Sequence, residues 1–146
     1  MLNIVPATGG NPVTVRTWGV QATWSNNSRR LAFVDTNNGY IGTLGLDGTE
    51  TRLDFDTRGS YDGDGCNPAY SPDGKLIVYL RYDGVMMIIP VNEHGQALGA
   101  PYPITSGAYY AGPPSFSNDG KTIVFSGNAG SDPNELGLYT VSVYGG

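Results

Sequence analysis

The sequence is poor in cysteine, histidine and lysine. Cys66 is the single cysteine and His94 the single histidine among 146 residues. One cysteine excludes an internal disulfide framework, and one histidine excludes a metal centre built from several histidines of one chain. Lysine occurs only at Lys75 and Lys121, and the 8 basic and 13 acidic residues give a net charge of −5. A surface this acidic argues against binding to nucleic acid or anionic lipid, because both require phosphate-neutralising cations.

Long apolar runs are also missing. The longest, Val85–Val91, is far shorter than the ~20 residues that span a bilayer. Met1–Pro6 lacks the basic start and the apolar length of a secretory signal peptide. We therefore expect no membrane insertion. The compartment stays open between a cytosolic protein, as the sequence stands, and a mature or excised piece of an exported one.

Glycine and tyrosine are abundant, with 22 and 10 copies, whereas only 14% of the residues are charged. The length favours a single domain. This composition disfavours a helical protein, and no segment has convincing helical periodicity. Short apolar or alternating segments bounded by Gly, Pro, Asn and Asp instead predict many strands joined by tight turns.

An internal repeat organises these strands. Aromatic-serine pairs recur at a constant spacing of 46 residues: Trp24-Ser25, Tyr70-Ser71 and Phe116-Ser117. Each pair is followed by a turn, a basic residue and a second aromatic residue: Asn26–Ser28, Arg29 and Phe33; Pro72–Gly74, Lys75 and Tyr79; Asn118–Gly120, Lys121 and Phe125. The Ser-Pro-Asp-Gly turn suits a tight connection between strands, because proline fixes φ and glycine accepts a positive φ.

The repeat predicts an all-β fold, a β-propeller of four-stranded antiparallel blades, since four strands every ~40–45 residues are typical of propeller blades. The alternative is a β-sandwich with accidental similarity, which does not require a repeated turn in phase. The second strand of each repeat is expected at Leu31–Val34, Leu76–Leu80 and Ile123–Ser126. The third strand is expected at Tyr40–Leu46, Val85–Val91 and Leu138–Tyr144. A fourth strand is expected in two repeats, at Thr51–Phe55 and Pro103–Thr105.

The segment Ala69–Tyr79 and its counterparts resemble the TolB-like propeller repeat. Pro114–Lys121 matches that pattern with Asn118 in place of proline, and Trp24–Phe33 matches it with a degraded turn. The resemblance implies the fold and says little about function. Relatives include the periplasmic Tol-Pal component, propeller domains of prolyl-oligopeptidase-type peptidases and oligogalacturonate lyases. The lyase relatives use a histidine-bound metal and the peptidases a separate hydrolase domain, and this sequence offers neither.

About three blades are predicted for this chain, with partial blades at 1–17 and 110–146 and repeats at 18–63 and 64–109. Propellers typically have 4–8 blades, so three do not close a ring. We expect two copies to form a homodimeric, six-bladed ring in which Pro12–Thr17 completes the partner's last blade. One third-type strand, Leu2–Ala7 or Leu138–Tyr144, is then surplus. The alternative is a fragment of a larger propeller protein.

The loop Tyr61–Asn67 carries the densest chemistry, because Asp62 and Asp64 flank a glycine and Asn67 follows closely. Oxygen ligands of this kind suit calcium, so these three residues are a candidate metal site. A solvated acidic turn is the competing interpretation, and the spacing does not match an EF-hand. Apart from this calcium ion no cofactor is expected.

Trp18, Arg81, Tyr109 and Tyr110 fall in loops that, together with the Asp62 and Asp64 loop, share the face around a propeller channel. Aromatic residues there could stack on a ligand or simply pack between blades. The predicted function is a non-catalytic module that binds a protein, a peptide or a small ligand at this face. The alternative is a carbohydrate-active or sugar-binding propeller that uses the channel carboxylates. Ser71 has no histidine base at a fixed spacing, so the repeated serines are expected to be structural.

Overall fold

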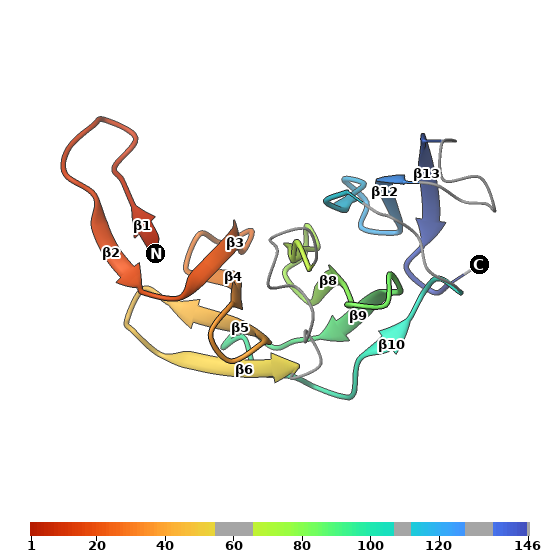
Figure 1. Cartoon of the computed structure of the whole chain (residues 1–146), viewed down its shortest axis with the longest axis horizontal. Helices are drawn as coiled ribbons and strands as arrows, with labels where there is room; N and C mark the ends of the chain where they lie inside the picture. Colours follow the sequence, from red (N-terminus) through yellow and green to blue (C-terminus); the bar gives the residue numbers. More distant parts are fainter. Residues whose placement is uncertain (55–65, 107–111, 128–135, 146) are drawn as a thin grey trace.

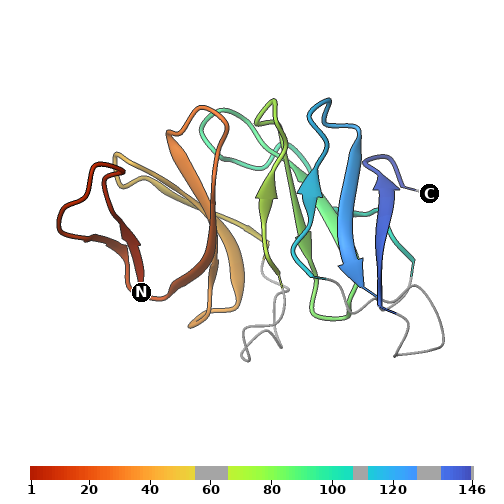
Figure 2. The ribbon, with the colours of Figure 1, turned by 90° about the horizontal axis from the view of Figure 1, so that it is seen from above.

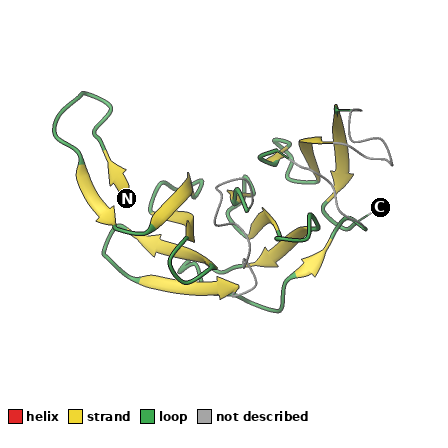
Figure 3. Ribbon diagram, in the orientation of Figure 1, coloured by secondary structure: helices red, strands yellow, loops and turns green. Residues whose placement is uncertain are grey.

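The computed structural model describes residues 1–54, 66–106, 112–127 and 136–145. In these ranges the chain is built of antiparallel strands without any helix (Figure 3). The predicted all-β class is therefore confirmed. None of the described residues form a helix with the length and hydropathy needed to cross a membrane.

The strands form four antiparallel sheets. The N-terminal hairpin consists of β1 (Leu2–Ile4) and β2 (Val13–Arg16). Blade 1 consists of β3 (Gly19–Trp24), β4 (Arg30–Asp35), β5 (Tyr40–Gly45) and β6 (Glu50–Asp54). Blade 2 consists of β7 (Ala69–Tyr70), β8 (Leu76–Leu80), β9 (Met86–Pro90) and β10 (Tyr102–Pro103). The end blade consists of β11 (Ser115–Phe116), β12 (Thr122–Gly127) and β13 (Gly137–Ser142).

These sheets stand side by side in an open arc (Figures 1 and 2). The first strand of each blade lies on the concave side, where β3 contacts β7 and β7 contacts β11. The outer strands β6 and β10 lie on the convex side (Figure 1). Strands are ordered within each blade as they are in sequence, so the chain moves outward through one blade and then returns to begin the next.

The repeated turn is held by one serine and one carboxylate. Ser71 Oγ donates to Asp73 Oδ1 at 2.6 Å and accepts from the Leu76 amide at 2.9 Å. Ser117 makes the equivalent bonds to Asp119 and Thr122. These hydrogen bonds lower the pKa of both aspartates. The serines are therefore structural, as their sequence context predicts.

The core lies between the sheets rather than within one of them. Strands β4 and β5 are buried along their whole length, and β8 and β9 nearly so. Such strands read as continuous apolar runs because both of their faces are covered. By contrast, β12 alternates between buried and exposed residues, so one face of the end blade is open.

A partly buried polar network joins the N-terminal hairpin to blade 1. Arg16 NH2 lies 2.5 Å from Asp35 Oδ2 and 3.3 Å from Glu50 Oε1, and it donates to the Tyr40 hydroxyl at 2.8 Å. The Tyr40 hydroxyl donates in turn to Glu50. Burial, followed by this bond and the charge of Glu50, raises the pKa of Tyr40 to about 12. Leu2 and Val15 complete the contact by packing on the apolar part of the same face.

Candidate functional site

The arc has two rims. Among the described residues, the channel rim carries the segment between β2 and β3, the loop between β4 and β5 and the loop between β8 and β9. Their proximity is visible at blade 1, where the Thr36 amide donates to the Trp18 carbonyl at 3.0 Å. The turn rim, on the opposite side, carries the Ser-Asp turns and the turns between third and fourth strands.

Trp18 is the predicted channel-rim aromatic residue that the structure describes. Its side chain is 58% exposed, so it is not buried between blades and is available for contact with a ligand. Four other predicted residues, Asp62, Asp64, Tyr109 and Tyr110, lie outside the described residues.

Arg81, the predicted basic contact, is half-buried and paired within its own loop. Its Nε and NH2 donate to the two carboxylate oxygens of Asp83 at 2.9 and 2.6 Å. This bidentate bond, together with the Val85 amide, lowers the pKa of Asp83. The loop therefore presents an ion pair rather than an isolated cation.

Asn67, the third predicted metal ligand, stands beside Gln21 of the neighbouring blade. Its backbone amide donates to Gln21 Oε1 at 3.1 Å. Gln21, Cys66 and Asn67 have positive φ values of 50°, 88° and 32°. Residues other than glycine rarely adopt this backbone conformation. Gln21 and Asn67 are 46 residues apart, so the repeat places two amide side chains on equivalent inner positions of adjacent blades.

Metal ligands do not gather elsewhere in the described part of the chain. Within it, no three side chains of His, Cys, Asp or Glu come close enough to hold an ion. Cys66 is fully buried in the core between blades 1 and 2. His94 is an exposed turn residue next to Glu93, as its position after an apolar strand predicts.

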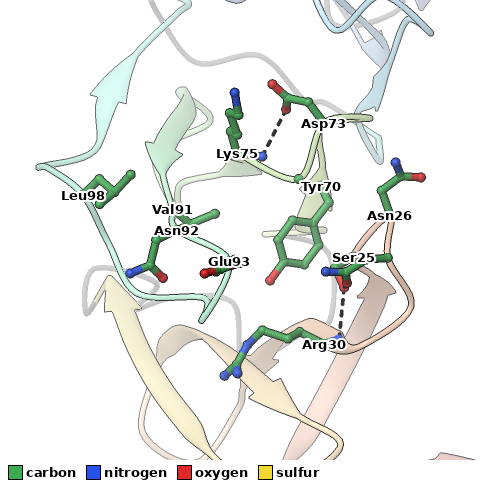
Figure 4. Close-up of a pocket in the computed structure, with 12 residues that line it drawn as sticks. Ser25, Asn26, Arg30, Tyr70, Asp73, Lys75, Val91, Asn92, Glu93 and Leu98 are labelled. Carbon is green, nitrogen blue, oxygen red and sulfur yellow. Dashed lines mark hydrogen bonds between the residues drawn. The ribbon is translucent and has the colours of Figure 1, made fainter.

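A pocket of about 390 Å³ lies on the turn rim between blades 1 and 2 (Figure 4). Its walls come from the turn after β3, the turn after β7 and the turn after β9. The residues that line it are Ser25, Asn26, Asn27, Arg30, Tyr70, Asp73, Gly74, Lys75, Val91, Asn92, Glu93 and Leu98.

Arg30 brings a buried charge to this pocket, since the residue is only 8% exposed. Its NH1 donates to Thr49 Oγ1 at 3.2 Å, and its NH2 donates to the Thr49 carbonyl at 3.0 Å. Its Nε is buried and has no partner among the described residues. None of the ion pairs formed within the described ranges includes Arg30. Asp47 is connected to it indirectly, because Thr49 Oγ1 donates to Asp47 Oδ1 at 2.6 Å.

Tyr70 supplies the second unpartnered group. Its hydroxyl is buried without a hydrogen-bond partner among the described residues. Burial raises the pKa of Tyr70 to about 12, and the nearby charge of Arg30 only partly opposes this shift. In Figure 4 the hydroxyl points toward Arg30. At neutral pH it is therefore a neutral phenol that can donate a hydrogen bond.

Sequence reasoning placed ligand contacts only on the channel rim and missed this pocket. A signal was nevertheless present in the repeat. Leu76 and Thr122 occupy the position of Arg30, and Trp24 and Phe116 occupy the position of Tyr70. The guanidinium of Arg30 and the phenol hydroxyl of Tyr70 are therefore polar groups that none of their counterparts in the repeat carries.

Comparisons with known proteins give similarity in structure only. No family model matches the sequence, and no curated protein matches it either. The hydrazine synthase of Kuenenia stuttgartiensis is 14% identical, with a TM-score of 0.64 over 97% of this chain and 40% of that chain. The acylaminoacyl peptidase of Pyrococcus horikoshii is 15% identical, with a TM-score of 0.51 over 80% of this chain and 18% of that chain. The tricorn protease is 16% identical, with a TM-score of 0.50 over 83% of this chain and 12% of that chain.

These similarities and the sheet topology define the chain as β-propeller-like. The predicted architecture of repeated antiparallel blades is thus confirmed. The chain spans less than half the length of each of these three structures. One of them is a synthase and two are peptidases, and a shared fold assigns none of these activities to this protein.

Proposed function

We propose that this protein is a non-catalytic interaction module: a half-propeller that assembles with a second copy and binds a ligand at the channel rim. The observation that carries the assembly is the open face of the end blade. Val124 on β12 is 38% exposed, whereas its counterparts Val78 and Ala32 are fully buried. All three stand at the same position of the 46-residue repeat.

The neighbouring strand gives the same result. Leu138 pairs with Ser126, as Met86 pairs with Leu80 and Ile41 with Val34. The exposed fraction is 79% for Leu138, compared with 1% for Met86 and 0% for Ile41. In blades 1 and 2 this face is covered by the next blade. Among the described residues, no sheet covers this face of the end blade.

Blade 1 of a second copy is the occupant we propose for this face. Within one chain the N-terminal hairpin covers blade 1, through Leu2, Val15 and Arg16, in the place that the partner's end blade would take. In the assembly β2 of one copy lies beside β13 of the other and acts as the fourth strand of its end blade. Two such junctions join two arcs into a six-bladed ring, and β1 or β13 is displaced from its present pairing.

The assembly is tested by measuring the mass of the isolated chain in solution by light scattering. Wild type is expected at twice the chain mass, and Leu138→Lys at the monomer mass, because a charge on the covered face opposes its burial. Leu46→Lys is the matched control, since Leu46 is also exposed but lies in a turn of blade 1. A wild-type chain that is monomeric and well folded would overturn the dimer.

A longer propeller is the alternative source of the missing sheet. The partial coverage of every structure compared above favours this alternative. It would leave the isolated chain monomeric or aggregated, and addition of strands from a natural extension would restore a stable monomer. The same light-scattering experiment therefore distinguishes the two possibilities.

For the ligand we propose a protein or peptide bound at the channel rim, where Trp18 is exposed and the pair Arg81–Asp83 offers polar contacts. The net charge of −5 favours a cationic partner. Trp18→Ala should weaken capture of basic peptides without changing the melting temperature. Equal capture by wild type and variant would exclude Trp18 from the contact.

Calcium remains the one ion proposed for this rim, at the loop of Asp62, Asp64 and Asn67. An ion that binds only the folded state raises the melting temperature. A rise in millimolar calcium, absent in Asp64→Asn, would support this site. The same melting temperature with calcium and with chelator would remove it.

A further inference from the structure

We propose, as an extension of the assembly described above and dependent on it, that β1 is an internal substitute for β13 of a second copy. The two strands lie at opposite ends of the arc (Figure 1). β1 pairs with the edge of β2 that the partner's β13 takes in the ring. Assembly therefore proceeds by exchange of β1 for β13, with Leu2 and Leu138 competing for one place on blade 1.

The pairing of β1 with β2 reproduces the outer half of a complete blade. In β1 and β2 the register shifts between Leu2 and Asn3. In β5 and β6, the third and fourth strands of blade 1, it shifts between Ile41 and Gly42. A strand irregularity of this kind is a specific local feature. Its recurrence indicates that β1 is built as a third strand and β2 as a fourth, with Leu2 in the place of Ile41.

The turn after β1 has the geometry of the turn after β13. Gly9 follows Leu2 by seven residues, and Gly145 follows Leu138 by seven residues. Both glycines have a φ of 87°. Each glycine amide donates to the carbonyl three residues earlier, at 2.9 Å for Gly9 and 3.0 Å for Gly145. Strands β1 and β13 are thus two versions of the same element within one chain.

Leu2 already fills the place on blade 1 that Leu138 of the partner takes in the ring. It packs on the cluster formed by Phe33, Tyr40 and Leu44. Leu138, by contrast, is 79% exposed. The same side chain at the same position of the blade is therefore covered at one end of the arc and uncovered at the other.

The internal substitute is smaller than the element it replaces. β1 has three residues in a sheet of two strands, whereas β13 has six residues in a sheet of three. A cavity of about 180 Å³ remains between the hairpin and blade 1, with Ile4 and Val15 on one side and Leu31 and Leu44 on the other. A two-stranded sheet is marginally stable by itself. We therefore assign displacement to β1 rather than to β13.

The open face of the end blade is suited to burial because it carries no charge. The residues that β12 and β13 place on this face are Thr122, Val124, Ser126, Leu138, Thr140 and Ser142. Covering them desolvates no ionised group, which would be the largest penalty. In the exchange Leu138 replaces Leu2, Thr140 replaces Ile4, and Val124 adds apolar area that the hairpin does not provide.

A reversible disulfide between β1 and β2 tests the exchange. Asn3 and Thr14 are exposed, opposite residues, and Thr14 Oγ1 donates to Asn3 Oδ1 at 2.7 Å. Opposite residues of antiparallel strands lie within the span of a disulfide. In the lock variant, Asn3→Cys with Thr14→Cys, oxidation fixes β1 on β2. Light scattering at one protein concentration should give a dimer for the reduced lock variant and a monomer for the oxidised one.

The matched control carries Asn3→Ser and Thr14→Ser, which remove the same side chains without forming a bond. Treated with the same oxidant, it should remain dimeric. The native Cys66 is fully buried and is kept in every variant, so the engineered pair is the exposed thiol pair in the described part of the chain.

The two equivalent leucines give a second test that needs no disulfide and remains valid if the lock variant does not fold. Leu2→Ala should tighten the dimer about tenfold, because it weakens only the internal competitor. Leu138→Ala should weaken the dimer by a similar factor, because it removes the side chain that the exchange buries. Sedimentation velocity over a range of concentrations measures both dissociation constants. A general loss of stability does not produce opposite changes at the two positions.

Failure of the exchange and failure of the assembly give different results. If wild type and the reduced lock variant are both monomeric, the assembly is wrong and the exchange with it. If the oxidised lock variant is still a dimer, the exchange alone is wrong, because β1 then stays on β2 in the ring. A weaker dimer in Leu2→Ala would overturn the exchange in the same way.

Discussion

At the residue scale, Gly95 is a contact between blades 1 and 2 on the turn rim. It belongs to the turn after β9, and its carbonyl accepts from Thr43 Oγ1 of blade 1 at 2.9 Å. An added Cβ would lie 2.5 Å from Arg30 Nε and closer still to Thr43 Oγ1. Glycine is therefore required here both by its φ of +71° and by the neighbouring blade.

Gly95→Ala should destabilise the protein by more than the conformational cost alone. That cost is about 1–2 kcal/mol for a left-handed residue, and the clash with Thr43 and Arg30 adds to it. Gly74→Ala is the matched control, because Gly74 has a φ of +72° and nothing within 4 Å of an added Cβ. Denaturant unfolding measures both variants. Equal losses of stability in the two variants would show that blades 1 and 2 are not closely packed at Gly95.

Single side chains are also where prediction from the sequence was weakest. Arg30 follows a polar turn and looks like a surface residue in the sequence, yet it is buried by the turn that contains Gly95, 65 residues further along the chain. Tyr70 occupies an aromatic position of the repeat, and nothing in that pattern indicates that its hydroxyl is buried without a partner among the described residues. Both properties depend on contacts between blades, which no local pattern in the sequence encodes.

At the element scale, prediction was strongest where hydrogen bonds are local. The Ser-Asp turns close within six residues, from Ser71 to Leu76, so their residues alone specify them. The strands after them follow from apolar runs, and the predicted Leu76–Leu80 matches β8. A position that departs from the repeated sequence can still adopt the same backbone conformation: Ser28 has a φ of 55° where the other repeats have Gly74 and Gly120.

The N-terminal hairpin shows what such patterns omit. Its second strand was expected at Pro12–Thr17 and is observed as β2, Val13–Arg16. The sequence did not indicate that Arg16 would pair with Asp35, 19 residues away and completely buried. That pairing determines where the hairpin sits, because it connects β2 to the end of β4.

Arg16→Met should release the hairpin from blade 1. Asp35 is completely buried, and leaving a buried charge without its partner costs about 2–5 kcal/mol. Adding Asp35→Asn to Arg16→Met should recover part of this stability, because it removes the buried carboxylate charge that Arg16 no longer pairs. Limited proteolysis between β1 and β2 and denaturant unfolding provide the measurements. An Arg16→Met variant as resistant as wild type would mean that Leu2 and Val15 suffice to hold the hairpin.

At the scale of the whole molecule, the 46-residue repeat was sufficient to predict separate antiparallel sheets arranged one after another. It could not predict the functional site, because the repeat encodes the scaffold and the departures from it encode the specialised contacts. The channel-rim residues Trp18 and Arg81 were correctly expected in loops, whereas the bidentate partner of Arg81 in Asp83 was not anticipated.

A chain of sheets that touch only their neighbours should unfold from its ends. Amide hydrogen exchange should be slowest in β8 and β9, whose residues are covered on both sides, and fastest in the N-terminal hairpin and β13. Mass spectrometry of peptides from exchanged protein measures this gradient. If a second copy covers β13, its protection should also rise with protein concentration. Uniform protection along the chain would contradict the gradient.

The two ends of the arc differ: one is a polar-anchored hairpin, and the other is a three-stranded sheet with Val124 and Leu138 uncovered. A junction between unlike ends is head-to-tail, and each junction leaves another pair of ends to be joined. Such growth stops only when the rotation per copy divides a full circle, and otherwise it propagates as a helical filament. If copies join through these ends, the curvature of these few sheets therefore decides between finite particles and fibres.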